Sequence, residues 1–410
     1  MPSVYLEPER LASPDSLTAL LLERAGIDED LVADGWDGAH GAQPSAPTGR
    51  ASSLTAEYFE CAGTGAEERL QAVLDGSGLA VTTGQQPQLF GGPLYVLYKA
   101  LTAVRIAAEL ETKVGAPCLA VFWVASDDHD WREIGSASLL DSEETIRRFA
   151  VPEPPGSGRR PVGPSQLPPE IADVAVDFCA HLETRPEGAR WTSLVAEAYQ
   201  PGDTFARSFM DVLRAWIGDL PMAFLDSAQP ALRRAAVPLV RRVLEQHPAI
   251  EVALSRGIER VEKTEHVPQL AFLAGASPVF RDDGEGRHRL YHESNGFRMG
   301  KAGNEMPTAD LLAELEAFPE RFSPSAALRP VVESYVLPVA ATVLGPGEIA
   351  YWAQLPPLFE ALQVDMPLVA PRTAWRVVEP RMARLLEKTG ISADELRDGG
   401  CLLYTTDAAD

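Results

Sequence analysis

The sequence is poor in cysteine and in positive charge. Its four cysteines are widely separated and show no paired spacing: Cys61, Cys118, Cys179 and Cys401. This pattern argues against a disulfide framework or a zinc knuckle. Asp and Glu total 59 against 36 Lys and Arg, so the formal net charge at pH 7 is −23. Such a chain offers no broad basic surface to nucleic acid or to an acidic membrane, and a small-molecule site is favoured instead.

Long apolar runs are also missing. No run reaches the ~18 residues that a membrane span needs. The first residues, Met1 to Glu7, lack the basic start and the apolar core of a signal peptide. We therefore expect a cytoplasmic protein. At 410 residues with 45% apolar content, the chain can bury a large core and is expected to hold more than one domain.

The clearest pattern in the chain covers residues 79–131. A β-favouring run, Leu79 to Thr83, leads into a loop with three glycines. From Leu94 the apolar period becomes helical. A continuous apolar run, Cys118 to Ala125, then predicts a strand that is buried on both faces. It ends at a polar segment, residues 126–131. These elements form a βαβ unit whose polar groups gather at the carboxyl ends of its strands, where open α/β sheets bind ligands.

A second βαβ unit is expected near the C-terminus. A strand over Val336 to Val343 leads into Gly345-Pro346-Gly347-Glu348, then a helix, then a strand over Met366 to Ala370. The segment between the two units contains amphipathic helices at 203–217 and 231–246 and a β-hairpin at 280–299. We expect an α/β fold divided as follows: an arm (1–50), the first core half (51–151), a linker or helical insertion (152–200), core continuation (201–257), a β-rich insertion (258–306), and the second core half (307–375).

The end of the chain does not continue these patterns. Residues 376–400 are expected to begin a helical region, and Ser392 to Glu395 form a capping box. The helix that this box announces has little length before Gly399-Gly400. We expect that the chain is cut short here and that residues 401–410 are a non-native tail.

Several ordered motifs resemble the bacillithiol-biosynthesis cysteine-adding enzymes. The matching stretches are residues 83–95 with Tyr98-Lys99, residues 122–131, residues 328–330 and residues 345–352. The resemblance implies a Rossmann-like core with inserted connecting segments, similar to class I aminoacyl-tRNA synthetase cores. It also implies a C-terminal helical coiled coil that forms a homodimer. Because that coiled coil is expected about where this sequence ends, dimerisation of this chain is in doubt.

The activity implied by the resemblance is the ligation of L-cysteine to glucosaminyl-malate, the last step of bacillithiol synthesis. Joining an amine to a carboxylate usually requires activation by ATP, so ATP or ADP is the expected cofactor. The sequence leaves a need for Mg²⁺ open, and we assign no metal site. Two alternatives remain: a nucleotidyltransferase or hydrolase on the same core, or a non-catalytic nucleotide-binding module.

The glycine-punctuated loop and the helix after it are the expected cofactor site. Glycines permit close approach of an anion, and a helix N-terminus presents free N–H groups to it. The residues assigned to this role are Gly84, Gln85, Gln86, Gly91, Gly92, Pro93, Tyr95 and Lys99. No Walker or G-x-G-x-x-G pattern is present, and the bare motif also fits an ordinary strand–helix turn. The family resemblance favours the anion site.

The acidic segment after the second strand supplies the expected catalytic residues, Asp128, His129 and Asp130. His129 could act as a general base that a neighbouring acid orients. Alternatively, the carboxylates could bind Mg²⁺ or an amine or hydroxyl of a ligand, or the segment could be a solvated strand end. In a continued strand, Asp128 and Asp130 would point opposite to His129. One histidine without a second His or a nearby Cys is poor spacing for zinc.

The remaining candidates are expected to bind substrate. They are Asp127, Trp131, Arg329, Gly345, Gly347, Glu348, Tyr351 and Arg372. Glu348 would repel a phosphate, so its loop suits a ribose hydroxyl or an ammonium, although a helix-capping role is equally ordinary. Either Arg329 or Arg372 could pair with the malate carboxylates. The first βαβ unit is thus expected to hold the anion and the acid–base group.

Overall fold

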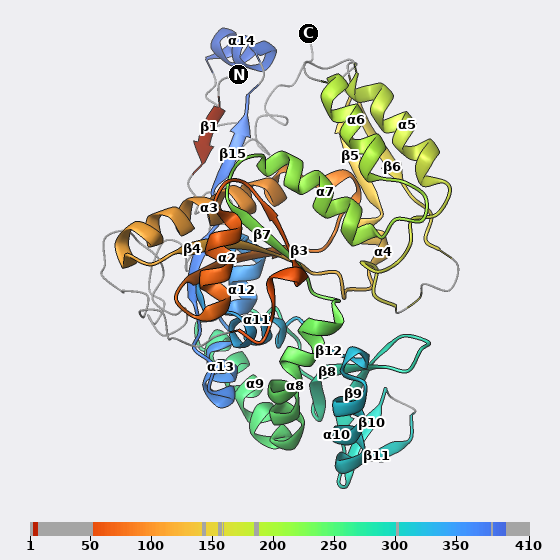
Figure 1. Cartoon of the computed structure of the whole chain (residues 1–410), viewed down its shortest axis with the longest axis vertical. Coiled ribbons are helices and arrows are strands. Elements are labelled where there is room, and N and C mark those ends of the chain that lie inside the picture. Colours follow the sequence, from red (N-terminus) through yellow and green to blue (C-terminus); the bar gives the residue numbers. More distant parts are fainter. Residues whose placement is uncertain are drawn as a thin grey trace, which may run out of the picture.

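A computed structural model describes residues 3–6, 52–141, 145–154, 158, 160–183, 188–300, 303–378 and 380–390. The expected capping box at Ser392, the tail at 401–410 and most of the N-terminal arm lie outside these residues. The described part of the arm is strand β1 (Ser3–Leu6), which pairs antiparallel with β15 (Ala374–Val377) beside helix α14 (Pro380–Thr389) (Figure 1).

The core is a six-stranded sheet with the order β14-β13-β3-β4-β7-β2. Its strands are β2 (Phe59–Ala62), β3 (Leu79–Gln85), β4 (Cys118–Val124), β7 (Met222–Asp226), β13 (Val339–Leu344) and β14 (Leu368–Pro371). Five strands are parallel, and only the edge strand β2 runs antiparallel. The sheet is the Rossmann-like core expected from the sequence.

Helices cover both faces of the sheet. Alternate residues of β4 enter different apolar clusters: Phe122 packs on the face covered by α3 (Leu94–Val114) and α7 (Phe205–Ile217). Trp123 packs on the other face. That face is covered by α2 (Ala66–Asp75), α8 (Pro230–Glu245), α9 (His247–Glu262), α11 (Arg329–Val336) and α13 (Pro356–Leu362). Successive side chains of β4 point to opposite faces of the sheet, and helices cover both faces. Every position is therefore buried, and β4 appears in the sequence as a continuous apolar run.

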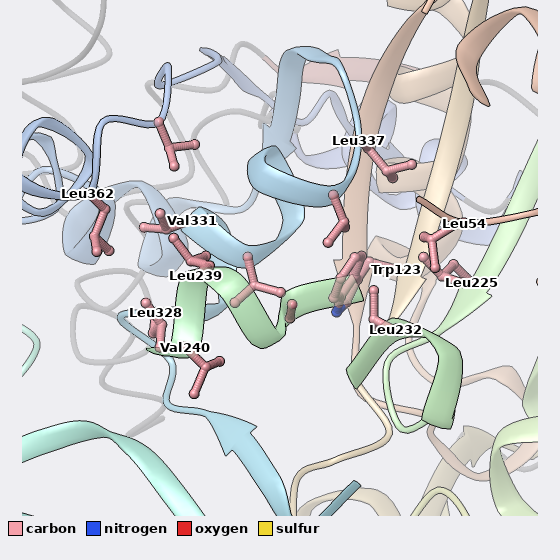
Figure 2. Packing of buried hydrophobic residues seen from close by; sticks show 14 of the residues in the cluster. Leu54, Trp123, Leu225, Leu232, Leu239, Val240, Leu328, Val331, Leu337 and Leu362 are labelled. Atoms are coloured by element: carbon pink, nitrogen blue, oxygen red, sulfur yellow. The ribbon is translucent and has the colours of Figure 1, made fainter. Parts of the chain in front are cut away.

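Figure 2 shows the second of these clusters, in which Leu239 of α8 faces Val331 of α11 and Trp123 lies at the end of β4. The apolar contacts hold α8 and α11 against the carboxyl edge of the sheet. This packing fixes the position of the charged residues that α11 carries at its start.

Two smaller units flank the core (Figure 1). The first contains α4 (Trp131–Ile134), β5 (Ser136–Leu140), β6 (Ile146–Ala150), α5 (Ile171–Leu182) and α6 (Gly188–Ala198). Phe149 and Phe178 share one apolar cluster, with their ring centroids 5.2 Å apart. Residues before and after the boundary predicted at residue 151 therefore pack in the same apolar cluster. The Pro/Gly-rich segment at 152–169 lies between β6 and α5, which both belong to this unit.

The second unit is a five-stranded antiparallel sheet with the order β11-β10-β9-β8-β12. It contains β8 (Ala276–Asp282), β9 (Arg287–His292), β10 (Gly296–Met299), β11 (Glu305–Pro307), α10 (Thr308–Ala317) and β12 (Phe322–Pro324). The β-hairpin predicted at 280–299 is present as the antiparallel strands β8, β9 and β10, but the sheet extends beyond it. The additional strands β11 and β12 are three residues long, too short to show a period-two pattern.

Most predicted core elements are confirmed, and two need correction. The strand predicted over Val336–Val343 begins only at Val339, because α11 occupies residues 329–336 and was missed. The single helix predicted after Gly345 is two helices, α12 (Pro346–Trp352) and α13. Pro356 begins the second of them. None of the helices within the described ranges combines the length and apolarity needed to cross a membrane.

Candidate functional site

The candidate site lies where the order of the sheet reverses. From β3 the chain crosses through α3 to β4 on one side, whereas from β13 it crosses through α12 and α13 to β14 on the other. The loops after β3 and β13 therefore diverge, and open α/β sheets bind ligands in this position. The Thr83 hydroxyl donates to the carbonyl of Val343 over 2.9 Å and ties the two strand ends together.

Lys99 and Glu348 form the centre of this edge. The Lys99 side chain is only 2% exposed, and its ammonium pairs with the Glu348 carboxylate. It also donates to the carbonyl of Gly84 over 2.8 Å and to Oε1 of Gln85 over 3.0 Å. Burial lowers the pKa of Lys99, while Glu348 acts in the opposite direction. Because these three partners use its three donors, Lys99 contacts a phosphate only if one of them leaves.

Glu348 also caps the helix that carries it. Its Oε2 accepts the N–H of Gly345 over 2.8 Å, so the Glu348 side chain caps the first turn of α12 from within the helix. The N–H of Glu348 donates in return to the backbone carbonyl of Gly345 over 3.0 Å. Gly345 is buried between Glu348, Arg372 and Lys99, and a Cβ there would lie 3.3 Å from Glu348 Oε2. Gly347 has open space around its Cα. Glu348 thus has the structural role that the sequence left open, and it faces the site at the same time.

Two further charged residues come from α11. Arg329 and Glu333 are four residues apart, and the Arg329 guanidinium donates to the Tyr351 hydroxyl over 3.3 Å. Burial raises the pKa of Glu333 to about 7, against the lowering effect of Arg329. They border a small pocket with Trp123, Leu344, Glu348 and Tyr351. Glu333 was not predicted from the sequence, although an acid that follows Val331-Val332 shortly after Pro330 was a usable signal for a helix.

Arg372 lies at the more open end of the site. It follows β14, and its guanidinium carbon is 5.7 Å from the centroid of the Tyr95 ring, at the start of α3. Burial lowers the pKa of Arg372, and Glu348 raises it. Arg372 and Tyr95, which the sequence assigned to different ligands, are therefore brought together beside the N-terminus of α3.

The glycines of the first loop shape the backbone. Gly91 and Gly92 have φ values of 85° and 75°, which favour glycine. Their N–H groups donate within the loop, to Gln88 and Leu89 carbonyls over 3.2 Å each. A Cβ at Gly84 would lie 2.7 Å from the carbonyl oxygen of Trp123. Pro93 is the N-cap of α3. An anion at this loop would thus meet the start of α3 rather than the Gly91 and Gly92 N–H groups.

Two consecutive glutamines join the two sides of the site. Gln85 accepts from Lys99, as described above, and Gln86 donates from Nε2 to Oδ2 of Asp128 over 2.6 Å. The Asp128 carboxylate also accepts the N–H of His129 over 2.6 Å and lies 3.4 Å from His129 Nδ1. These bonds hold the pKa of Asp128 well below its ordinary value despite burial. The His129 side chain is 51% exposed, open to a ligand.

The other residues of the acidic segment have internal partners. The chain turns after β4 ends at Val124, so strand alternation does not apply to residues 126–130. Asp130 is the N-cap of α4 and accepts the N–H groups of Arg132 and Glu133. Trp131 is buried against Phe205, and its Nε1 donates to the carbonyl of Val151 over 2.9 Å. The structure therefore separates Asp130 and Trp131 from the Asp128–His129 pair.

Asp127 is buried in an ion pair. Its Oδ2 lies 3.2 Å from Arg233 Nη2, and its Oδ1 accepts the Ser227 hydroxyl over 2.9 Å. Although burial raises it, Arg233 and Arg287 hold the pKa of Asp127 below its ordinary value. Beside it, Ser126 donates to Asp226, whose pKa is raised by burial. This polar network across the ends of β4 and β7 was not predicted, because it pairs residues a hundred positions apart.

The residues present fit a nucleotide phosphate at one place. Arg372, Tyr95 and the first turn of α3 offer a cation, a hydroxyl and a helix N-terminus together. In the described ranges, no three His, Cys, Asp or Glu side chains are grouped closely enough to hold a metal ion.

Comparison with known proteins identifies a family with a Rossmann-like domain. The family model "Bacillithiol biosynthesis BshC, N-terminal Rossmann-like domain" matches residues 51–373. Curated relatives with the name "Putative cysteine ligase BshC" include a Heliobacterium modesticaldum protein, 31% identical over 340 residues that cover 82% of this chain and 61% of the relative. A Salinibacter ruber protein is 33% identical over 341 residues, 80% of this chain and 60% of its own. The chain thus spans about three fifths of the length of these relatives.

Proposed function

Because the chain belongs to the BshC family of bacillithiol biosynthesis, we propose that it carries the catalytic core of a ligase that joins L-cysteine to glucosaminyl-malate. In this reaction the amine nitrogen of glucosaminyl-malate bonds to the carboxyl carbon of cysteine. One carboxylate oxygen leaves on an activating group, and the amine gives up a proton to a base. The product is an amide.

The observation that carries the proposal is the set of buried charges at the switch point of the sheet. Lys99, Glu348, Arg329 and Glu333 converge there from three helices, next to Asp128 and His129. Burying this much charge is costly for a merely structural purpose. An amide-forming enzyme needs such groups to orient a carboxylate and an amine and to stabilise a developing oxyanion.

His129 is the proposed general base. Its ring is exposed, and Asp128 lies 3.4 Å from Nδ1. A carboxylate in this position orients the imidazole and stabilises its protonated form. The two alternatives for the acidic segment, a Mg²⁺ site or an amine-binding site, also depend on Asp128 but do not require the imidazole.

Activation is proposed to use ATP, which would transfer a phosphoryl or nucleotidyl group to a carboxylate oxygen of cysteine. That oxygen then leaves with the transferred group when the amine attacks the carboxyl carbon. Arg372 and the start of α3 would hold the phosphates, and the Tyr95 hydroxyl would donate to them. Arg372 then has no role with the malate carboxylates.

The experiment is a product assay by mass spectrometry. The chain is incubated with L-cysteine and glucosaminyl-malate, with and without ATP and Mg²⁺, and the Salinibacter ruber relative is assayed in parallel. We expect cysteine-dependent amide formation that increases with ATP. ATP turnover without an amide would favour the hydrolase or nucleotidyltransferase alternative. Nucleotide binding without any turnover would favour the non-catalytic module.

A further inference from the structure

The pocket between α11 and α12 has charges of both signs that are not paired with each other. Arg329 and Glu333 are one turn apart on α11, a spacing at which Arg and Glu commonly pair. Among the residues that the structure describes, no ion pair joins them, and the guanidinium makes its side-chain hydrogen bond to Tyr351. Both side chains border the pocket. A carboxylate and a guanidinium thus line one pocket without an ion pair between them.

A third polar group lines the same pocket. Trp123 is only 2% exposed, and its indole Nε1 has no hydrogen-bond partner within the described part of the chain. A buried donor without a partner costs free energy of folding. Trp123 also lines a neighbouring pocket beside Arg233. In the pocket next to α11, Ala125, Pro330 and Leu344 add apolar lining. The pocket therefore offers a cation and an anion beside apolar side chains.

We propose that this pocket is the subsite for a small α-amino acid zwitterion, with the carboxylate on Arg329 and the ammonium on Glu333. The two charges of an α-amino acid are separated by a single carbon atom, which matches the side-by-side placement of the two side chains. This assignment rests on the proposed function, in which the amino acid is cysteine. In this assignment Glu333 binds the ammonium of cysteine. Arg329 binds the carboxylate of cysteine rather than a carboxylate of malate.

The charges around Glu333 support this assignment. The groups that act on it are Arg329 on its own helix, Glu348 on α12, Lys99 on α3 and the Thr82 hydroxyl on β3. Lys99 is already neutralised by Glu348, so Arg329 is the main opposing charge. Burial raises the pKa of Glu333 to about 7. An arriving ammonium would favour the ionised form, so amino-acid affinity should increase as the pH rises through about 7.

The test is calorimetric binding of L-cysteine and two analogues to the whole chain. Cysteamine lacks the carboxylate, and 3-mercaptopropionate lacks the ammonium. We expect L-cysteine to bind about 10- to 100-fold more tightly than either analogue, because each loses a charged hydrogen bond. Equal affinity for all three compounds would overturn the proposal. Since it uses the unmodified protein, this comparison does not depend on the folding of a variant.

Variants assign the two charges to their residues. Glu333→Gln should weaken L-cysteine binding about 10-fold or more and remove its dependence on pH near 7, yet leave 3-mercaptopropionate binding unchanged. Arg329→Met should do the reverse, affecting L-cysteine and 3-mercaptopropionate but not cysteamine. The control is Glu360→Gln, an exposed residue of α13 that pairs with Arg256 at the surface. A Glu333→Gln protein that binds L-cysteine normally would overturn the proposal.

The binding experiment and the ligase assay can fail independently of each other. L-Alanine and L-serine carry the same two charges, and they too should bind with dependence on Glu333 and Arg329. If such binding occurs but no amide forms, the subsite stands and the proposed function fails. If amide forms while binding is indifferent to both residues, the ligase proposal stands and the subsite is wrong.

Discussion

At the scale of single residues, the site separates groups that the sequence presents as one run. Among residues 127–131, Asp127 is locked in a buried ion pair, Asp130 caps a helix and Trp131 packs in a core. Of this segment, Asp128 and His129 keep side chains that are partly exposed to solvent. A motif of adjacent acids therefore contains three different physical roles, and only the structure distinguishes them.

The first prediction concerns His129. His129→Asn keeps a polar side chain of similar size but removes the general base, so we expect turnover to fall by about 100-fold or more. Because the side chain is exposed, the thermal unfolding midpoint should not change. His181→Asn is the matched control, since His181 also lies near an aspartate, Asp177, on the outlying helix α5. Unchanged turnover in His129→Asn would reject a catalytic role.

A second prediction concerns the buried pair of Asp127 and Arg233. Asp127→Asn leaves the Arg233 guanidinium without its counter-charge and should lower the free energy of unfolding by about 3–5 kcal/mol. Glu109→Gln, which breaks the exposed pair with Arg105, should change it by less than about 1 kcal/mol. Denaturant titration at pH 7 measures both. A loss of similar size in the two variants would contradict the assignment.

The pH dependence of this stability has a definite sign. In the folded protein the pKa of Asp127 lies below its ordinary value, which is about 4. The stabilisation is therefore fully present above about pH 4 and is lost as the pH falls through the folded-state pKa. The difference in stability between wild type and Asp127→Asn should accordingly shrink in acid. A difference that grows as the pH falls would show that another group dominates.

At the scale of elements, the strands and helices of the parallel core could be predicted from the sequence. The short elements α11, β11 and β12 could not. Strands β3 and β4 are visible in the sequence as β-favouring or apolar runs because successive residues are buried, and helix α3 is visible through its helical period. Helix α11 was missed because it is only eight residues long, too short for a helical period to stand out before the strand that follows it. Glu333 was missed with it, so the candidate site was predicted without one of its buried acids.

One close contact between elements gives the third prediction. Gly163 lies directly on the turn after β4, and its N–H donates to the carbonyl of Ser126 over 2.9 Å. A Cβ at this position would be 2.0 Å from the Cβ of Ser126. Gly163→Ala should therefore displace residues 126–129 and lower turnover about 10-fold or more. Gly202→Ala places its Cβ where no atom is near, but its φ of 90° strains the backbone. It should therefore lower stability without lowering turnover, which separates general destabilisation from displacement of residues 126–129.

At the scale of the whole molecule, one arginine joins the β-rich unit to the core. Arg287 of β9 donates to the backbone carbonyl of Asp127, to the Ser323 hydroxyl over 2.8 Å and to the carbonyl of Pro324 over 3.1 Å. It thus contacts the acidic segment from a unit that is distant in the sequence. No sequence pattern could show this contact, because it depends on how two sheets that are distant in the sequence pack in one apolar cluster.

The fourth prediction follows from that contact. Arg287→Leu should loosen the β-rich unit, so amide hydrogen exchange in residues 276–299 should quicken while β3 and β4 remain protected. Arg298→Leu is the control, since Arg298 pairs with Glu293 within the same sheet. If exchange is equally fast in both variants, the effect reflects damage to the sheet rather than its attachment to the core.

The burial of Lys99 makes it a natural reporter on the site. The protein has five lysines, and Lys113, Lys263 and Lys388 are exposed while Lys99 is not. An amine-acylating reagent followed by peptide mapping should modify those three quickly and Lys99 slowly. A ligand that displaces Glu348 would free the ammonium and accelerate its acylation. A ligand that closes the pocket would protect it further. The direction of the change in labelling would therefore show how substrate arrival alters this ion pair.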